Sequence, residues 1–194
     1  MENNNHPRKG SAIKVDPIKD IKDIKALKKK LAPNPVYYAL FILGIETAFR
    51  AVDLLTITAG QVRGLKEMDP LTIIEKKTKK ERTVNLNKEC IAAIKTLLAT
   101  KKYNDDDKLF TGQRGPLIVP SISRLVKQWC ASLHLRGNYA AHTLRKTFGY
   151  HQRVTFGVGI AELMDVFGHS NQKITLRYLC IQPEEIKNIY ANII

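Results

Sequence analysis

The stretch that decides the fold reads Ala-His-Thr-Leu-Arg-Lys-Thr-Phe and covers residues 141–148. His142 and Arg145 are three residues apart, so on a helix they lie on the same face. Near a helix start, such side chains join free backbone N–H groups and the positive end of the helix dipole, a natural seat for a phosphate. A surface histidine beside a surface arginine also arises by chance in a basic protein, so the pair needs support from elsewhere in the chain.

A second stretch, Phe-Gly-His-Ser at residues 167–170, is followed by Tyr178 nine residues after His169. Gly168 ends an apolar segment in the way that a C-cap glycine does, and His169 then projects from the turn. Tyr178 lies on the next segment, residues 173–179. The commoner fate of a tyrosine is to be half-buried with its hydroxyl on a backbone carbonyl, and this alternative stays open for Tyr178.

Two further cations belong to the candidate set. Arg50 and Asp53 are charges within the otherwise apolar stretch 46–55, where an unpaired charge is costly. A purely structural ion pair between Arg50 and Asp53 explains why both charges occur there. The same ion pair would also hold Arg50 in place if this arginine is functional. Lys77 lies in a polar turn, residues 76–80, where solvation alone is enough to explain any of the lysines.

The order and spacing of these residues resemble the motif pattern of the tyrosine recombinases, also called phage integrases. The family pattern runs T-G-x-R, a β-hairpin lysine, H-x-L-R-x-T-F, L-G-H-S and then a tyrosine. The resemblance covers about residues 34–181, which correspond to the catalytic domain of the family. Its most specific parts are the stretch that begins at His142 and the Gly-His-Ser segment that leads to Tyr178.

The chain departs from this pattern at several positions. Ala48 replaces the usual glycine before the first arginine, and Phe167 replaces the usual leucine before Gly-His. Thr78 and Lys79 stand where a glycine often turns the hairpin. The neighbouring lysines, Lys76 and Lys79, therefore remain alternatives to Lys77 as the lysine of the pattern.

The resemblance implies a DNA strand-exchange enzyme that needs no cofactor, no metal ion and no ATP. Guanidinium groups match two phosphate oxygens at once, and a tyrosine with an ordinary pKa near 10 needs a proton acceptor to attack phosphorus. The implied product is a 3′-phosphotyrosine with a free 5′-hydroxyl. The implied roles are Tyr178 as nucleophile, Lys77 as general acid, Arg50, Arg145 and His169 as phosphate ligands, and His142 in proton transfer.

Composition points to a polyanionic partner. The chain has 194 residues and a formal net charge of +14, which indicates nucleic acid or an acidic membrane surface. No apolar run approaches the roughly 20 residues of a membrane span, so the membrane interpretation rests on charge alone. The three cysteines lie far apart, without a C-x-x-C pair, and favour a reducing cytoplasm over secretion: Cys90, Cys130 and Cys180. The charge thus favours nucleic acid as the partner, and the resemblance to tyrosine recombinases implies that this nucleic acid is duplex DNA.

The order of elements predicts a mainly helical α+β domain. Two strands at 72–74 and 83–86 form a hairpin, and the predicted helices are 18–31, 36–49, 52–55, 88–99, 120–133, 143–153, 159–167 and 183–193. We expect a flexible polar and basic tail at 1–16, a catalytic domain at 17–182 and a C-terminal helix at 183–194. That helix either covers its own domain or docks on a neighbouring subunit, as the family's tetramer on DNA implies.

About 33 residues precede the part that resembles the catalytic domain, so we expect no N-terminal DNA-clamp domain: the chain is a minimal integrase or a catalytic fragment. Three other functions stay open at this stage. They are a DNA-binding regulator that kept the fold without catalysis, a type IB topoisomerase that relaxes supercoils, and a membrane-surface module. Strand cleavage, plasmid relaxation and liposome flotation discriminate among them.

Overall fold

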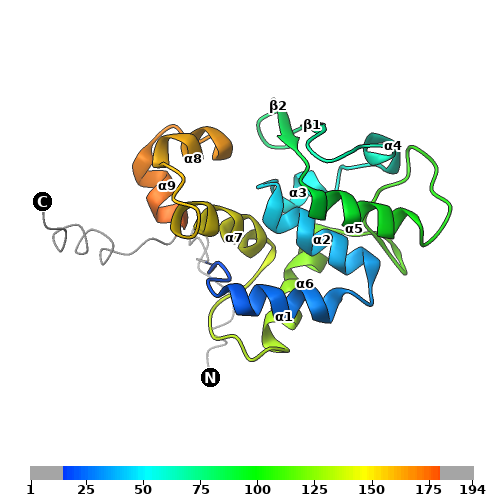
Figure 1. Cartoon of the computed structure of the whole chain (residues 1–194), viewed down its shortest axis with the longest axis horizontal. Coiled ribbons are helices and arrows are strands. Elements are labelled where there is room, and N and C mark those ends of the chain that lie inside the picture. The colour runs from blue at the N-terminus through cyan, green and yellow to red at the C-terminus, as the bar shows by residue number, and fades with distance from the viewer. Residues whose placement is uncertain (1–14, 180–194) are drawn as a thin grey trace, which may run out of the picture.

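A computed structural model describes residues 15–179, and the predicted C-terminal helix at 183–194 lies outside them. The described part is mainly helical with two small antiparallel sheets, which confirms the α+β prediction (Figure 1). Its helices are α1 (Ile21–Leu31), α2 (Pro35–Glu46), α3 (Ala51–Leu54), α4 (Ala59–Val62), α5 (Lys88–Leu98), α6 (Val119–Ala131), α7 (Ala141–Val154), α8 (Ile160–Phe167) and α9 (Gln172–Leu179); its strands are β1 (Pro70–Ile74), β2 (Glu81–Asn85), β3 (Thr111–Gly112) and β4 (Gly115–Pro116).

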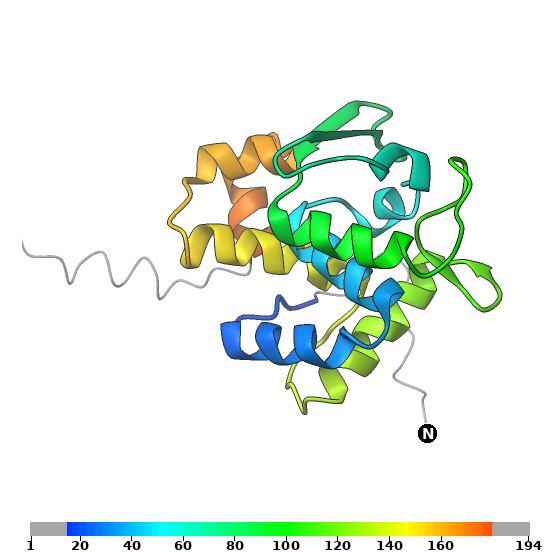
Figure 2. The ribbon, with the colours of Figure 1, turned by 45° about the vertical axis from the view of Figure 1, so that its right-hand side comes forward.

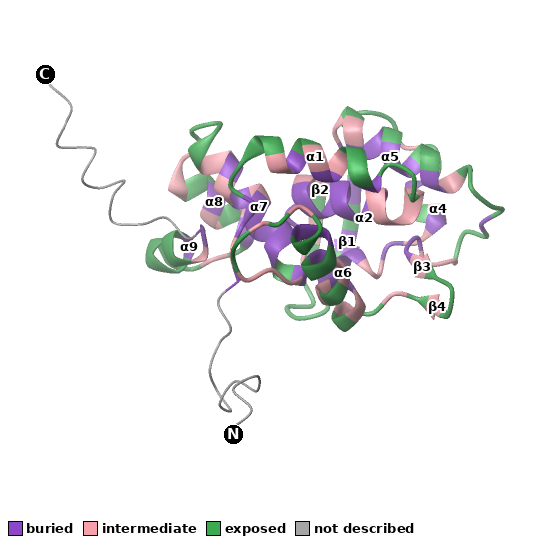
Figure 3. Cartoon of the chain, turned by 90° about the horizontal axis from the view of Figure 1, so that it is seen from below, coloured by how far each residue is buried: buried purple, intermediate pink, exposed green. Residues whose placement is uncertain are grey.

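The main core is built around α2, which is apolar on almost every side and buried along most of its length (Figure 3). Asn34 caps its start by accepting a hydrogen bond from the Tyr37 backbone N–H, and Pro35 occupies the first turn. Helices α1, α5 and α7 pack against it. A Cβ on Gly44 would lie 2.6 Å from Leu144 Cδ1, so a glycine here lets α2 and α7 approach closely.

The predicted hairpin is formed by β1 and β2, which pair antiparallel with Leu71 opposite Val84 and Ile73 opposite Arg82. Each strand begins two residues earlier than predicted. Leu71 and Ile73 are buried while their neighbours on β1 are exposed, the alternation expected of a strand with one face on the core. Figure 2 shows this hairpin beside the α8–α9 pair, although the two are far apart in sequence.

A second, smaller core lies where α8 and α9 pack beside α7 (Figure 2). It contains Ala48, Leu163, Phe167 and Leu179. A Cβ on Gly149 of α7 would lie 2.6 Å from both Phe167 Cζ and Leu179 Cδ2, so the small residue allows α8 and α9 to sit directly on α7.

The segment before α1 is held against α7. Lys146 Nζ donates to the Val15 carbonyl at 2.9 Å, the Ile18 N–H donates to Thr147 Oγ1 at 2.9 Å, and His151 Nε2 lies 2.9 Å from the Ile18 carbonyl. Of the expected tail, residues 1–14 lie outside the described part of the chain, and Val15 is buried. Helix α1 begins at Ile21 and not at residue 18 as predicted, because Asp20 caps it by accepting a hydrogen bond from the Lys22 N–H while the main chain of Ile18 is bonded to α7.

Within residues 15–179, none of the helices has both the length and the apolar character needed to cross a lipid bilayer.

Candidate active site

Helix α7 carries the His142 and Arg145 pair. Its first turn is stabilised by the Thr143 hydroxyl, which accepts a hydrogen bond from the Ala140 N–H at 3.1 Å. The helix therefore begins at Ala141, two residues before the predicted start. His142 is exposed in the first turn, whereas Arg145 lies one turn later and is only 3% exposed.

Arg145 is fixed from several sides. Its Nη2 donates to the Phe167 carbonyl at 3.1 Å, and the guanidinium carbon lies 5.1 Å from the Phe167 ring centre and 5.9 Å from the Tyr178 ring centre. Burial lowers the pKa of Arg145 to about 10, which still leaves the group charged at neutral pH. A charged guanidinium is thus held rigidly beside the tyrosine.

Gly168 ends α8 as the sequence predicts. Its φ of 64° and ψ of 39° are left-handed, and the His169 N–H returns to the Met164 carbonyl at 2.9 Å. The His169 side chain then turns toward α9, where its Nδ1 lies 3.0 Å from Thr175 Oγ1. Burial and the charges of Arg145 and Arg50 lower the pKa of His169, so its neutral form is favoured.

Tyr178 lies on α9 and is surrounded by the other motif residues. The centre of its ring is 5.5 Å from that of His142 and 5.2 Å from that of His169, both in edge-on geometry. Lys146 Nζ lies 5.4 Å from the same ring centre. The structure therefore brings four of the six sequence-predicted residues together around one phenol: His142, Arg145, His169 and Tyr178.

Arg50 lies at the start of α3, next to this group. The chain leaves α2 through Ala48, whose φ of 55° lies in the left-handed region that favours glycine. Ala48, which replaces the glycine of the family pattern, is therefore in the turn that places Arg50 at the start of α3. The predicted helix 36–49 is wrong at this end because α2 stops at Glu46, before this turn. Arg50 Nη1 lies 3.8 Å from Asp53 Oδ2, so the expected internal pair is present.

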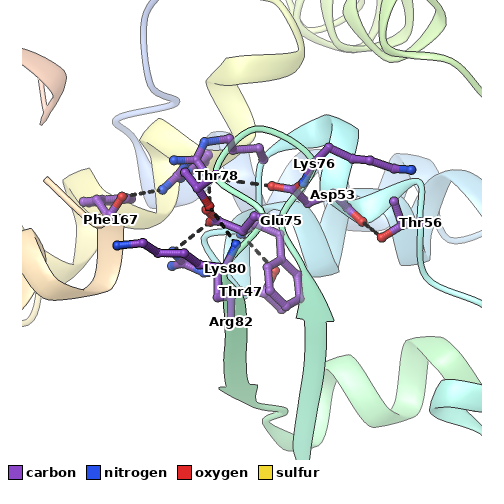
Figure 4. Close-up of polar contacts among 12 residues, drawn as sticks. Thr47, Asp53, Thr56, Glu75, Lys76, Thr78, Lys80, Arg82 and Phe167 are labelled. Carbon is purple, nitrogen blue, oxygen red and sulfur yellow. Dashed lines mark hydrogen bonds and ion pairs between the residues drawn. The ribbon is translucent and has the colours of Figure 1, made fainter.

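A closer partner of Arg50 was missed from the sequence. Glu75 follows β1 and places its Oε1 2.5 Å from Arg50 Nη1 (Figure 4). Its side chain is 8% exposed. The available signal was the alternation of β1, in which Leu71, Ile73 and then Glu75 face inward. A carboxylate at an inward position of a strand calls for a cationic partner.

Arg82 of β2 is the other functional candidate that the sequence did not reveal. Its Nη1 lies 3.4 Å from Glu75 Oε1, and its Nη2 donates to the Val166 carbonyl. The last carbonyls of α8, those of Val166 and Phe167, thus accept hydrogen bonds from Arg82 and Arg145. Two arginines at the negative end of a helix are favourable, and they link α8 to the hairpin and to α7.

Lys77 is exposed in the turn between β1 and β2. The root of this turn is tied to the Arg50 cluster because the Lys76 N–H donates to Asp53 Oδ1 at 2.8 Å. Lys76 itself directs its side chain away from Glu75 and Phe167 (Figure 4). Lys79 has a φ of 61°, the left-handed turn position where the family often has glycine.

Comparison with known proteins identifies the family. The model of the phage integrase family matches residues 18–185. The chain belongs to this family. Among its relatives, the probable integrase/recombinase YoeC of Bacillus subtilis is 34% identical over 181 residues, which cover 91% of this chain and 95% of YoeC. The tyrosine recombinase XerC of Caldanaerobacter subterraneus is 30% identical over 77% of this chain, which spans only 42% of that XerC.

Solved structures show that this member of the phage integrase family has the recombinase fold. The XerA recombinase superposes with a TM-score of 0.72 at 18% identity, over 96% of this chain and 65% of XerA. The Tn1549 transposon integrase, solved in complex with circular intermediate DNA, gives a TM-score of 0.67 at 21% identity, over 93% of this chain and 68% of that integrase. Members of the family are DNA strand-exchange enzymes, and family and fold together support site-specific DNA recombination.

The described part of this family member contains two buried cysteines. Burial raises the pKa of the Cys90 and Cys130 thiols to about 12, so neither is a nucleophile at neutral pH. Within the described part of the chain, no three histidine, cysteine or acidic side chains gather as metal ligands would.

Proposed function

We propose that this chain cleaves and rejoins duplex DNA through a 3′-phosphotyrosine intermediate, with Tyr178 as the nucleophile. The observation that carries the proposal is the gathering of His142, Arg145 and His169 around the Tyr178 ring. A formal net charge of +14 supports a DNA substrate, and such a substrate places the chain in the cytoplasm. Recombination of two duplexes breaks four strands, so the proposal includes a tetramer on DNA.

The scissile phosphate would bind to Arg50, Arg145 and His169. Charge gathers on the nonbridging oxygens as phosphorus becomes pentacoordinate, and fixed cations and donors stabilise that charge without reorganising. The buried Arg145 supplies such a fixed cation because its backbone partner, Phe167, holds it in place. Both guanidinium groups retain donors beyond their protein contacts.

In the first step the Tyr178 oxygen attacks phosphorus and the bond to the 5′-oxygen breaks. The phenol proton passes to His142, and Lys77 gives a proton to the departing 5′-oxygen. The products are a 3′-phosphotyrosine and a 5′-hydroxyl, and attack by another 5′-hydroxyl reverses the step without ATP. The choice of Lys77 over Lys76 and Lys79 is supported by its charge, which acts on His142.

His142 is suited to accept the phenol proton because its imidazole is neutral at physiological pH. Although the residue as a whole is exposed, its ring packs edge-on against Tyr178, and desolvation of the ring lowers its pKa to about 4. The positive charges of Arg145, Lys146, Arg50 and Lys77 act in the same direction. An unperturbed histidine, with a pKa near 6.5, would be mostly protonated at pH 5.

Cleavage is expected to change little with pH through the range in which an ordinary histidine titrates. Because a lowered pKa extends the neutral form of His142 down to about pH 4, the single-turnover cleavage rate should show no inflection near pH 6.5 and should fall only as the pH approaches 4. Quenched-flow assays between pH 4.5 and 7.5 measure this, with circular dichroism to confirm folding. An inflection near pH 6.5 that disappears in His142→Gln would show that His142 titrates with an ordinary pKa, and would contradict the lowered value.

The proposed function itself is tested by trapping the covalent intermediate. The substrate is a pool of duplexes with randomised arms and a nick close to the expected break. After cleavage, the short strand piece that carries the new 5′-hydroxyl dissociates, so religation cannot occur. We expect protein–DNA adducts that survive denaturing electrophoresis, enriched for one sequence, and duplex binding that weakens steeply with salt. Duplex binding without adducts would identify a regulatory protein, and sequence-independent relaxation of supercoiled plasmids would identify a topoisomerase.

A further inference from the structure

Glu75 is a buried carboxylate that the proposed chemistry does not use. It stands at the end of β1 and is 6% exposed. Its main chain closes the hairpin turn, because the Glu75 N–H donates to the Lys80 carbonyl and the Lys79 N–H donates to the Glu75 carbonyl, both at 2.9 Å. The residue is thus the root of the turn that carries Lys77.

The Glu75 carboxylate contacts three different parts of the site. Oε1 pairs with Arg50 at 2.5 Å and with Arg82 at 3.4 Å, while Oε2 accepts a hydrogen bond from Thr78 Oγ1 at 2.6 Å (Figure 4). Arg82 in turn reaches the Val166 carbonyl at the end of α8. One side chain therefore joins the start of α3, the hairpin turn and, through Arg82, the end of α8.

Both neighbours of Lys77 in the chain are anchored to carboxylates that also hold Arg50. On one side the Lys76 N–H donates to Asp53, and on the other the Thr78 hydroxyl donates to Glu75. Asp53 and Glu75 each pair with Arg50 Nη1. These contacts fix the position of the turn relative to Arg50, although the Lys77 side chain itself is exposed.

We propose that Glu75 is a positioning residue that fixes the turn bearing Lys77 relative to Arg50, so that the general acid meets the departing 5′-oxygen of the phosphate that Arg50 binds. The proposal rests on the function proposed above. A general acid contributes only when it lies within hydrogen-bond reach of the atom it protonates, and an exposed lysine on an untethered turn would spend little time there.

The charge of Glu75 is required for this role. Burial alone would raise its pKa, but the hydrogen bonds and charges of Arg50, Thr78 and Arg82 outweigh burial and lower it to about 2. The ionised group offers two acceptor oxygens to three donors. A glutamine offers one oxygen and turns an NH₂ group toward either the arginines or Thr78, so Glu75→Gln breaks at least one of the ties.

The test compares two leaving groups. In a 5′-bridging phosphorothiolate, sulfur replaces the departing 5′-oxygen and leaves as a thiolate, since thiols have a pKa near 8.5 and need no general acid. A defect in placing Lys77 disappears on this substrate, whereas a defect in phosphate binding or packing persists. Single-turnover cleavage of both substrates at saturating DNA is measured for the wild type, Glu75→Gln, Thr78→Val and Lys77→Ala. Glu81→Gln, an exposed carboxylate on the same hairpin, is the matched control.

We expect Thr78→Val to cleave ordinary DNA about 10-fold more slowly and Glu75→Gln about 100-fold more slowly, within the range that a general acid contributes. On the phosphorothiolate, Thr78→Val should match the wild type. The cleavage rate of Glu75→Gln on the phosphorothiolate should rise at least about 10-fold relative to the wild type, and the defect that remains is due to the lost contact with Arg50. Glu81→Gln should cleave both substrates at the wild-type rate. Thr78→Val changes one exposed side chain and keeps the test open if Glu75→Gln fails to fold.

Three failures are distinguishable. If Lys77→Ala is rescued by the phosphorothiolate but Glu75→Gln and Thr78→Val are equally slow on both substrates, the role of Glu75 is overturned while the proposed function stands. If Lys77→Ala is equally slow on both substrates, the proposed role of Lys77 fails, and the role of Glu75 fails with it. Absence of cleavage by the wild type contradicts the proposed function itself.

Discussion

Replacing Tyr178 with phenylalanine is expected to abolish covalent attachment to DNA and to leave duplex binding nearly unchanged. The substitution removes one oxygen and keeps the ring that contacts His142, His169 and Phe167. The proposed intermediate is an ester of that oxygen, so no other atom at this position can form it. Binding depends mainly on charge–phosphate contacts, which the substitution does not touch.

Denaturing electrophoresis of the trapped duplex measures the adduct, and fluorescence anisotropy measures the dissociation constant. Tyr150→Phe, the same change on α7, is the matched control and should form adducts at the wild-type level. An adduct formed by Tyr178→Phe would show that another side chain is the nucleophile.

Arg145→Lys is expected to slow cleavage by about 10²–10³-fold although the positive charge is kept, the loss typical of removing one donor from a transition-state site. The guanidinium of Arg145 donates to the Phe167 carbonyl and lies against the rings of Phe167 and Tyr178. A lysine has a single ammonium group at the end of a flexible stem, which cannot hold that carbonyl and grip two phosphate oxygens in the same planar fork.

The rate is measured by single-turnover cleavage of the trapped duplex at saturating DNA. Arg63→Lys changes an arginine that pairs with Asp105 near α4, and it should cleave at the wild-type rate. Thermal unfolding of Arg145→Lys separates a chemical defect from a loss of fold. Near-normal cleavage by Arg145→Lys would show that charge alone suffices at this position.

Local patterns were sufficient for most of the elements that carry the motif residues, but α9, which carries Tyr178, was predicted only as a segment at 173–179 and not as a helix. The spacing of His142 and Arg145 predicted one helical face, the glycine at 168 predicted the end of α8, and the polar turn at 76–80 predicted the hairpin. Each of these features depends on residues within one or two helical turns or a single tight turn. Propensity, capping and alternation act at that range.

Short elements without such a pattern were missed. Helix α4 has four residues and strands β3 and β4 have two each, too few to establish a period of 3.6 or of 2. Their existence depends on partners elsewhere: the backbone N–H of Ala59 donates to the carbonyl of Asp107, and that of Leu117 donates to the carbonyl of Phe110.

The sequence by itself singled out the side chains that we propose carry the chemistry, because their order and spacing match the motifs of the phage integrase family. Only the tertiary structure decided how they are held. Glu75 meets Arg50 across 25 positions of the chain, and Arg82 meets Val166 across 84. Such contacts exist only after α8 and the hairpin have packed beside α7, since burial is what makes an unpaired charge costly and so selects its partner.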